Sequence, residues 1–370
     1  MLQHLNTHGR LALRARDIGR IRAAALAADA AGFLTPAQQA MVHRRGWLRM
    51  LAPCAVGGGG LALPAMVRLE EQIAAVDGSM GWLVTLCAGA AWFAGFLPPA
   101  TAHAIIGTRR VCVAGSGAPT GYADVEGDGY RISGRWDYAS GAPMATHFTL
   151  NAVLRQEGRV LLDAAGAPRI RAFILPAGLV EVVASWGSIG LRATASHSYS
   201  VHGQWIDAAH GFAIDAAQAS DAGALYRFPF YSLAYVTLAA NLAGMAAHFL
   251  QLAEPAIARR RQPQSGLPLI DVPGVRERLE RAAGGLAAAR SDFYRLLDAA
   301  WELVDAGSPV SAANAAALRA ASLELVAAAR RAVDELYPYC GLYAAHQGSE
   351  INLVWRDFHT ATQHTLLLPE

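Results

Sequence analysis

Cysteine is scarce in this chain, and no two cysteines stand close together in the sequence. The 370 residues contain four, at Cys54, Cys87, Cys112 and Cys340. Closely spaced pairs such as C-x-x-C are typical of zinc sites and disulfide frameworks. Neither is therefore expected here, and no metal site is predicted. Reduced thiols are typical of the cytoplasm, which is the location that we expect for this protein.

Charged residues are also few. They make up 16% of the chain and nearly cancel, leaving a net charge of +2. The sequence has neither a long basic run nor a stripe of basic and aromatic residues, so no nucleic-acid partner is expected. Hydrophobic residues, at 54%, are abundant for a soluble monomer. This excess predicts that apolar surface is covered at subunit contacts.

No apolar run resembling a signal peptide is found near the beginning of the sequence. Two uncharged stretches, 82–107 and 228–253, have the length of a membrane span. Pro98 interrupts the first stretch, and Asn241 and His248 place polar groups in the second. We therefore expect buried helices, the second at the centre of an oligomer, and no membrane partner.

Hydrophobic periodicity divides the chain into three regions. Residues 1–109 are predicted to be mostly helical, with helix starts at Thr35 and Ser79. In residues 110–215, short apolar strands alternate with glycine-rich turns, which predicts a small β-barrel or sandwich. In residues 216–370, helices are expected over about 228–261, 272–305 and 311–336, with a last helix ending near residue 363. The predicted fold class is α+β, with a helical N-terminal domain, a middle β-domain and a C-terminal four-helix bundle.

Six short blocks occur in a fixed order along nearly the whole chain. They are L-A-P at 51–53, E-E-Q-I-A at 70–74, D-G-S-M-G-W at 77–82, P-T-G with G-D-G-Y-R-I-S-G-R-W within 119–136, the segment 186–196, and W-R-D at 355–357. In this order they resemble the acyl-CoA dehydrogenase superfamily of flavoproteins. The resemblance implies the same succession of helices, β-domain and bundle, and a homotetramer or homodimer in which bundle helices pack across subunits.

Two of the glycine-containing runs favour one branch of that superfamily. G-S-G-A-P-T-G at 115–121 and G-R-W-D-Y-A-S-G at 134–141 resemble the two-component flavin-dependent monooxygenases. That branch hydroxylates phenols and indoles and oxidises thiophenes and amino sugars. The resemblance therefore implies an oxygenase component that receives reduced FMN or FAD from a separate flavin reductase and acts on a small aromatic or amine substrate.

The carboxylate that an acyl-CoA dehydrogenase needs is missing from both expected positions. Such an enzyme uses a carboxylate to remove the α-proton of its substrate. In the superfamily this group lies near the position of Ala234 or about eight residues after the R-D pair. Between Asp221 and Glu254 there is no Asp or Glu, and the second position reads His364-Thr365-Leu366. A standard acyl-CoA dehydrogenase is therefore not expected.

The resemblance also assigns site residues by position. Ser140 is expected to hydrogen-bond flavin N5 or O4, and His364 and His359 to serve catalysis beside it, because imidazole titrates near neutral pH. The alternative for the two histidines is a surface or capping role. Trp82 and His147 are assigned to the substrate pocket. The other expected cofactor-binding residues are Trp136, Tyr138, Gly117, Thr194, Ser196 and Arg261.

Alternative interpretations remain open at this point. Trp136 and Tyr138 have core or interface packing as their alternative role. The whole chain has two alternatives, which are an acyl-CoA dehydrogenase or oxidase with a displaced base and a catalytically silent homologue that binds or assembles. The silent homologue stays an alternative because Ala195 stands where the superfamily usually has glycine and because the C-terminal tail is short.

Overall fold

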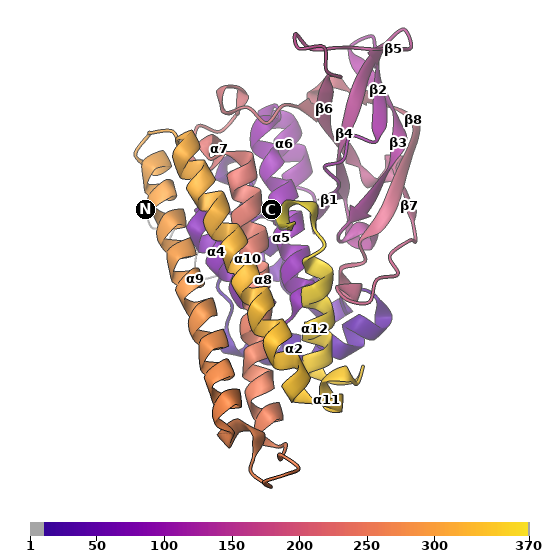
Figure 1. The fold of residues 1–370 in the computed structure, drawn as a ribbon. Coiled ribbons are helices and arrows are strands. Elements are labelled where there is room, and N and C mark those ends of the chain that lie inside the picture. Colours follow the sequence, from indigo (N-terminus) through magenta and orange to yellow (C-terminus); the bar gives the residue numbers. More distant parts are fainter. Residues whose placement is uncertain (1–10, 369–370) are drawn as a thin grey trace.

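The computed structural model describes residues 11–368 and consists of a helical body with a β-sheet along one side (Figure 1). Helices occupy the chain up to Ile106, strands lie between Val113 and Phe212, and helices resume at Ala224. The predicted combination of helices and β-structure is therefore confirmed.

The first part of the chain contributes helices whose starts have clear caps. Thr35 Oγ1 accepts the backbone N–H of Gln38 at 3.4 Å, so the predicted start at Thr35 is confirmed. The predicted cap at Ser79 is wrong. Asp77 Oδ1 accepts the N–H of Met80 at 2.9 Å and caps that helix instead, because its side chain reaches the free donors of the first turn. These helices are α2 (Ala15–Ala31), α3 (Pro36–Arg45), α4 (Leu63–Ala74), α5 (Gly78–Trp92) and α6 (Pro99–Ile106).

The described strands form one connected sheet with the order β7-β8-β3-β2-β4-β6-β9, and β1 and β5 also pair with β4. β1 and β2 run parallel to β4, whereas β3 is antiparallel to both β2 and β8. The strands are β1 (Val113–Gly115), β2 (Gly121–Glu126), β3 (Gly129–Ala139), β4 (His147–Gln156), β5 (Arg159–Val160), β6 (Ile170–Pro176), β7 (Glu181–Val183), β8 (His197–Asp207) and β9 (Gly211–Phe212). The β-region is thus a single sheet with β7 and β9 at its two ends.

β6 joins this sheet to the helices. Phe173 and Leu175 pack in an apolar core that belongs to the sheet region, whereas Ala172 and Ile174 join the core of the helical body. Neighbouring residues of a strand point to opposite faces, so β6 is buried on both.

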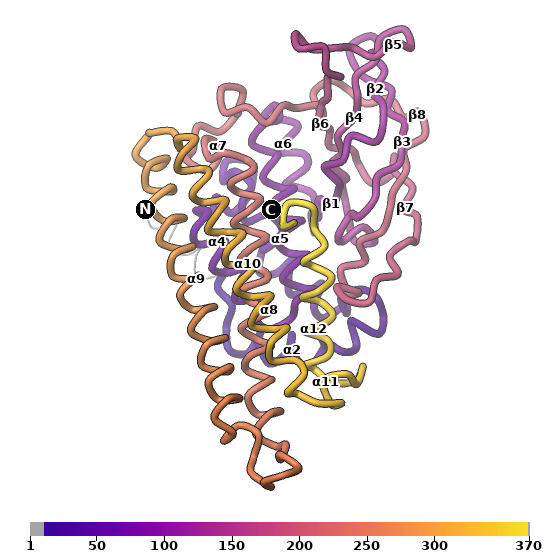
Figure 2. Tube along the Cα trace, in the orientation of Figure 1, coloured from indigo at the N-terminus to yellow at the C-terminus, as the bar shows by residue number. Residues whose placement is uncertain are grey.

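The last part of the chain forms long helices that lie side by side (Figure 2). α8 is central, since it contacts α4, α5, α10 and α12. The three longest helices match the predicted ranges closely, although the helix predicted to stop near Leu336 continues to Cys340. The helices are α7 (Ala224–Arg227), α8 (Phe230–Ala258), α9 (Pro273–Asp305), α10 (Ala312–Cys340), α11 (Leu342–Ala345) and α12 (Glu350–Ala361).

Two helical segments are long and apolar enough to cross a membrane, Gly78–Phe96 and Phe230–Ala258, but 83% of the most apolar window of each is buried within the protein. Asn241, inside α8, is fully buried and donates from Nδ2 to Thr85 Oγ1 at 2.6 Å. The prediction of buried helices is therefore confirmed. The cover over α8 comes from helices of its own chain, so burial of α8 does not depend on a neighbouring subunit.

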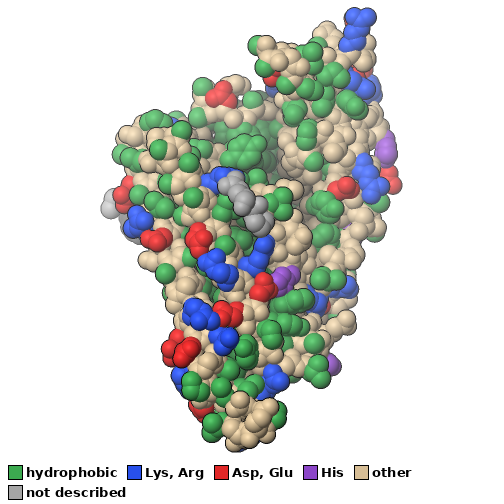
Figure 3. Space-filling view, viewed as in Figure 1, with side chains coloured by type: hydrophobic (Ala, Val, Ile, Leu, Met, Phe, Trp, Pro, Cys, Tyr) green, Lys and Arg blue, Asp and Glu red, His purple; other side chains and the backbone are tan. Residues whose placement is uncertain are grey.

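The N-terminal and C-terminal helices share one apolar core. A single cluster of buried side chains runs from Leu11 to Leu367, while a second cluster around Trp136 and Tyr199 fills the sheet region. On the face shown in Figure 3, acidic and basic side chains alternate over the helical body. This alternation agrees with the near-balanced charge of the sequence.

Candidate active site

Three hydroxyl groups that the sequence assigned to the cofactor form one hydrogen-bonded row. Ser140 Oγ lies 2.8 Å from Ser196 Oγ, and Ser196 Oγ lies 2.7 Å from Thr194 Oγ1. Thr194 Oγ1 in turn lies 2.7 Å from the carbonyl oxygen of Leu191. Ser140 follows β3 and the other two residues precede β8, so the fold joins positions 56 residues apart. We call Ser140, Ser196 and Thr194 the hydroxyl chain.

A β-bulge shapes the segment that carries Ser140. The register between β3 and β8 shifts between Trp136 and Ala139. Within the shift Tyr138 has a φ of 68°, and just beyond it Gly141 has a φ of 80°. Positive φ is easy for glycine and costly for tyrosine, by about 1–3 kcal/mol. The bulge leaves Tyr138 72% exposed, whereas Ser140 is buried.

Two buried cysteines support this turn. Cys87 Sγ, on α5, donates to the carbonyl oxygen of Ser140 at 3.5 Å and lies 3.7 Å from Cys112 Sγ. The N–H of Gly141 donates to the carbonyl oxygen of Thr194 at 2.8 Å. A Cβ at Gly141 would lie only 3.1 Å from Cys87 Sγ, so glycine is favoured there by space as well as by φ.

Two of the predicted cofactor-binding residues are completely buried. Trp136 is 0% exposed, its Nε1 donates to the carbonyl oxygen of Asn151 at 2.9 Å, and its ring stacks on Tyr199. These contacts favour core packing, the alternative role of Trp136, and its assignment to the cofactor stays a prediction. Thr194 is also 0% exposed, and its hydroxyl contacts that of Ser196.

His364 lies beyond α12, against the start of α5. Its ring packs edge-on to Trp82, with the ring centroids 6.0 Å apart. The N–H of Leu366 donates to His364 Nδ1 at 3.3 Å, which places the imidazole proton on Nε2. Burial lowers the pKa of His364, so the ring is neutral near pH 7. His364 is therefore a neutral hydrogen-bond donor through Nε2.

Ser140 and His364 both border α5, but they do not touch. The contact residues on α5, Cys87 and Trp82, are five positions apart, which corresponds to about 7.5 Å along the axis and to different sides of the helix. The structure brings the two groups to one helix, and their convergence on one flavin stays a prediction.

The other two predicted histidines lie elsewhere. His359 faces α10, where its Nε2 lies 3.2 Å from Asp334 Oδ1 and its ring packs on Trp355. His359 Nε2 thus has an ion-pair contact with the neighbouring helix but no hydrogen bond, and a catalytic role for His359 stays a prediction. His147, at the start of β4, lies with Nδ1 3.1 Å from Thr146 Oγ1. Burial and then His210 lower the pKa of His147 to about 4.

Gly117 and Arg261 lie on exposed segments. The carbonyl oxygen of Gly117 accepts from Asn151 Nδ2 at 2.8 Å, which holds the loop between β1 and β2. Arg261 follows α8 and donates to the carbonyl oxygen of Gly266 at 2.8 Å. This connection between α8 and α9 lies at the end of the bundle remote from the sheet (Figure 1). Arg261 is therefore distant from Ser140, Ser196 and Thr194 of its own subunit.

Two cavities of the described residues lie away from the hydroxyl chain. One of about 330 Å³ lies between Phe96 and the segment 208–220, with Arg171 in its wall. The other, of about 230 Å³, is bordered by Arg260 and Tyr343. Neither is lined by Ser140, Ser196 or His364, so neither is the predicted flavin slot.

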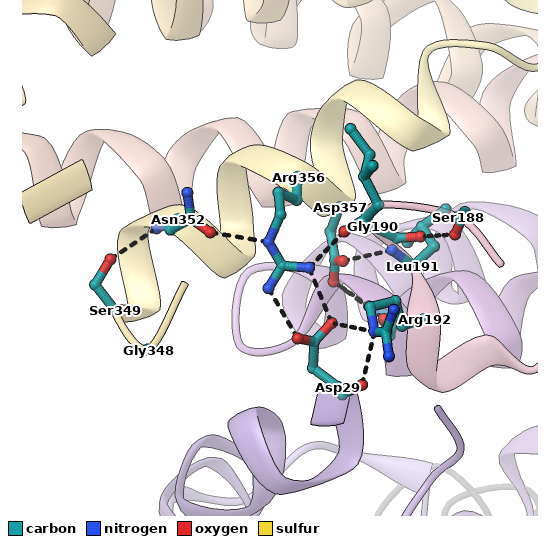
Figure 4. Close-up of polar contacts among 12 residues, drawn as sticks. Asp29, Ser188, Gly190, Leu191, Arg192, Gly348, Ser349, Asn352, Arg356 and Asp357 are labelled. Atoms are coloured by element: carbon teal, nitrogen blue, oxygen red, sulfur yellow. Dashed lines mark hydrogen bonds and ion pairs between the residues drawn. The ribbon is translucent and has the colours of Figure 1, made fainter. Parts of the chain in front are cut away.

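Three of the sequence blocks meet at Asp357, and Figure 4 shows two of them, through Leu191 and Asp357 itself. Asp357 Oδ1 accepts the N–H of Leu191 at 2.5 Å, and Oδ2 accepts the N–H and the hydroxyl of Ser79, each at 3.1 Å. Beside it, Arg356 pairs with Asp29 of α2 at 2.8 Å. This junction ties α12 to α2, to the start of α5 and to the loop that leads into the hydroxyl chain.

The carboxyl groups at the junction are held in an environment that disfavours charge. Burial, and then the nearby Asp77, raises the pKa of Asp357 to about 7. Burial also raises the pKa of Asp77 to about 6. A Cβ at Gly78 would lie 3.0 Å from Asp357 Oδ2, so this close packing requires glycine. The carboxyl oxygens of Asp357 and Asp77 accept from backbone N–H groups and from the side chains of Ser79 and Gln38, which indicates a structural role.

Sequence reasoning did not single out Asp29 or Cys87. Asp29 offered a signal, since a negative charge near the C-terminal end of α2 is unfavourable to the helix dipole and needs a partner such as Arg356. Cys87 offered none, because an apolar helix gives no hint of which face meets the turn at Ser140.

Comparisons with known proteins agree with this architecture. The family model described as "Acyl-CoA dehydrogenase, C-terminal domain" matches residues 236–369. An indole-3-acetate monooxygenase of Pseudomonas putida is 27% identical over 325 residues, covering 87% of this chain and 81% of that protein. The oxygenase subunit HsaA of a flavin-dependent monooxygenase from Mycobacterium tuberculosis is 23% identical over 334 residues, covering 88% and 83%.

Solved structures show the same fold. The HsaA monooxygenase from M. tuberculosis superposes with a TM-score of 0.88 at 20% identity, covering 99% of this chain and 94% of that one. XiaF from Streptomyces sp., solved in complex with FADH2 and glycerol, gives 0.86 at 20% identity, covering 99% and 92%. Residues 236–369 therefore match the acyl-CoA dehydrogenase C-terminal domain, and most of the chain is similar in sequence to the indole-3-acetate monooxygenase and to the flavin-dependent monooxygenase subunit named above.

Proposed function

We propose that this protein is the oxygenase component of a two-component flavin-dependent monooxygenase. It takes reduced FMN or FAD from a separate flavin reductase and oxidises a small aromatic or amine substrate. In the overall reaction the substrate gains one oxygen atom of O₂, the other leaves as water, and the reduced flavin supplies two electrons and becomes oxidised flavin. The proposal is supported by the names of the relatives, which include oxygenase components that depend on flavin.

The observation that carries the proposal is the hydroxyl chain, whose first member, Ser140, follows the bulge of β3. A flavin needs polar partners at its ring nitrogens and carbonyl oxygens, and apolar surroundings elsewhere. Ser140 supplies a buried hydroxyl, and the exposed ring of Tyr138 stands two residues before it. The residues of this turn therefore fit a flavin edge.

The chain's own residues have distinct tasks in this scheme. The flavin, when bound, supplies the electrons that activate O₂. Ser140 orients the ring edge through one hydrogen bond, while Cys87 and Gly141 hold the turn in place. His364 offers Nε2–H as a donor to an oxygen atom at the reacting centre, and Trp82 fixes its ring. The apolar surroundings on α5 exclude water.

An acyl-CoA dehydrogenase with a displaced base is less well supported. In α8 the first acidic residue is Glu254, near the end of the helix remote from the sheet. The carboxyl groups of Asp77 and Asp357 accept hydrogen bonds from within the protein, and Glu70 of α4 is 0% exposed. None of these buried carboxyl groups is placed to take a proton from a bound substrate.

We also propose that the protein is a cytoplasmic homotetramer or homodimer. Large apolar side chains remain exposed on the single chain, among them Leu342 at the start of α11. In such an assembly Arg261 of one subunit is available to a flavin of its neighbour.

Rapid mixing tests the proposal. Protein with anaerobically reduced FMN or FAD is mixed with oxygenated buffer, and the return of oxidised-flavin absorbance is followed. We expect this return to be delayed relative to free reduced flavin, and to be accompanied by product when indole or a phenol is added. A protein with firmly bound oxidised FAD that bleaches on addition of an acyl-CoA would favour a dehydrogenase. Absence of affinity for either redox state would favour a silent homologue.

A further inference from the structure

We propose that the larger cavity binds a small aromatic carboxylate and that Arg171 is its anion-binding residue. The cavity, of about 330 Å³, lies between the end of the short helix η3 (Phe93–Phe96) and the segment 208–220, which includes β9. Neither Ser140 nor His364 lines it, so this site goes beyond the proposed function and does not depend on a bound flavin.

Arg171 reaches the cavity across β9, the strand at one end of the sheet. Its Nη2 donates to the carbonyl oxygen of Gly211 at 3.2 Å. A Cβ at Gly211 would lie only 2.6 Å from Arg171 Nε. The φ of Gly211 is −93°, which any residue adopts, so the backbone does not require glycine. Glycine is favoured here because the side chain of Arg171 occupies the space of a Cβ.

The guanidinium of Arg171 has donors that the protein does not use. Arginine carries five N–H donors, and among the described residues only the carbonyl oxygen of Gly211 accepts from this one. Arg171 Nε is buried without a hydrogen-bond partner, and the guanidinium carbon lies 5.7 Å from the centre of the Tyr130 ring. Partial burial of a cation without an anion is unfavourable, and a bound carboxylate would relieve it.

The acidic residues of the neighbouring segment are directed elsewhere. Asp207, Asp215 and Asp221 each accept the backbone N–H two residues further on, at 2.7, 2.9 and 2.7 Å. The described wall of the cavity contains no Asp or Glu. The positive charge of Arg171 therefore remains available to a ligand.

The remaining wall of the cavity suits an aromatic ring. Phe96, Leu97 and Pro98 form one part of the wall, and Phe212 forms another. The rings of Phe212 and Phe93 pack with their centroids 5.1 Å apart, which holds Phe212 in place. The volume is near the lower end of the range for small-molecule sites. It fits a single ring with a short acidic side chain better than a nucleotide.

Calorimetric titration with phenylacetate tests the proposal. We expect one binding site per chain in the wild type. Arg171→Gln keeps a long polar side chain but removes the charge, so it should weaken phenylacetate binding by about tenfold or more. Phenylacetamide, the neutral analogue, should bind the wild type more weakly than phenylacetate by a similar factor, because its hydrogen bonds to the guanidinium carry no charge of their own.

Two further variants control this experiment. Arg169→Gln removes an exposed arginine just before β6 and should leave the dissociation constant of phenylacetate unchanged. Gly211→Ala puts a methyl group where Arg171 Nε now lies, and should weaken phenylacetate binding by displacing the guanidinium. Thermal unfolding of each variant shows whether it is folded.

The outcomes separate this site from the proposed function. Equal binding of phenylacetate by the wild type and a folded Arg171→Gln protein would place the ligand elsewhere and overturn the proposal. Equal affinity for phenylacetate and phenylacetamide, or no binding by the wild type, would overturn it as well. Binding of reduced FMN should be the same in the wild type and in Arg171→Gln. A wild type that binds no flavin would defeat the proposed function and leave the carboxylate site standing.

Discussion

His364 and His359 differ in what their reactive nitrogens face, although both lie at the C-terminal end of the chain. His364 keeps Nε2–H available beside Trp82, whereas His359 is paired with Asp334 of α10. We expect His364→Ala to lower product formation by about 100-fold or more, the usual contribution of a positioned polar group in catalysis. Binding of reduced flavin should be retained. Product and hydrogen peroxide are measured together, with indole or phenols as the substrate.

The matched control for this prediction is His359→Ala. It removes the same type of side chain from the face of α12 toward α10, and product formation should change by less than about threefold. Equal losses in the two variants, or unchanged product formation in His364→Ala, would contradict the role assigned to His364.

Asp357 is the other residue whose environment makes a prediction. Its folded-state pKa is raised to about 7 from 3.8, so its contribution to stability is fully present below pH 4 and is lost as pH rises through 7. Asp357→Asn should therefore lower the free energy of unfolding most at pH 5, by about 1–3 kcal/mol, because one carboxyl oxygen becomes an amide donor facing another N–H. At pH 8 the deficit should be smaller by about 2 kcal/mol.

Urea unfolding at the two pH values measures this difference. Asp292→Asn, which removes an exposed carboxylate of α9, should change the unfolding free energy by less than about 0.5 kcal/mol at either pH. A deficit for Asp357→Asn that grows from pH 5 to pH 8 would show that the carboxyl group is ionised in the folded state.

At the scale of the element, the start of α5 combines a cap with an unfavourable charge. Asp77 accepts the N–H of Met80, yet its carboxylate also raises the pKa of Asp357. Asparagine caps helices about as well as aspartate. Asp77→Asn should therefore keep the cap, lower the pKa of Asp357 and stabilise the protein at pH 8, whereas Asp77→Ala should cost about 1 kcal/mol. Urea unfolding at pH 8 measures the free energy of unfolding of both variants. Equal destabilisation by the two substitutions would contradict this account.

The sequence predicted the helices of this protein better than it predicted which side chains of the strands point into the core. The 3.6-residue period of α8, α9 and α10 survives in the sequence because one face of each helix packs on the shared core. In β3 the alternation of two breaks at the bulge before Ala139. Tyr138, within this bulge, is therefore exposed, whereas Trp136 precedes it and lies in the core, although its sequence block assigned it to the cofactor.

The candidate site divides in the same way. The sequence blocks gave Ser140, Ser196 and Thr194 their shared assignment, and the structure joins them by hydrogen bonds. No sequence pattern shows which hydroxyl donates and which accepts in this row. That order depends on the carbonyl oxygen of Leu191, which accepts the last hydrogen bond of the row. The junction at Asp357 likewise depends on contacts 278 and 166 positions apart in the chain.

For the whole molecule, the shared core of the N-terminal and C-terminal helices does not bury all of the large apolar side chains. At the end of α10, Leu342 is 89% exposed, beside the exposed Tyr343 and the cavity that Arg260 borders. Exposure of these apolar side chains to water does not stabilise an isolated chain, whereas a subunit contact would bury them. We therefore expect the wild type to have two or four times the mass of the chain in light scattering after gel filtration.

A charge in this surface tests whether it is the contact. Leu342→Asp should shift the population toward smaller species, because burying an unpaired carboxylate at an interface costs more than the contact of one leucine contributes. Leu162→Asp replaces another exposed leucine, 56% exposed in the turn after β5 of the sheet, and should leave the mass unchanged. A monomeric wild type would contradict the proposed homodimer or homotetramer. A mass that falls with Leu162→Asp and not with Leu342→Asp would move the contact from the bundle to the sheet, and with it the neighbour that Arg261 is proposed to reach.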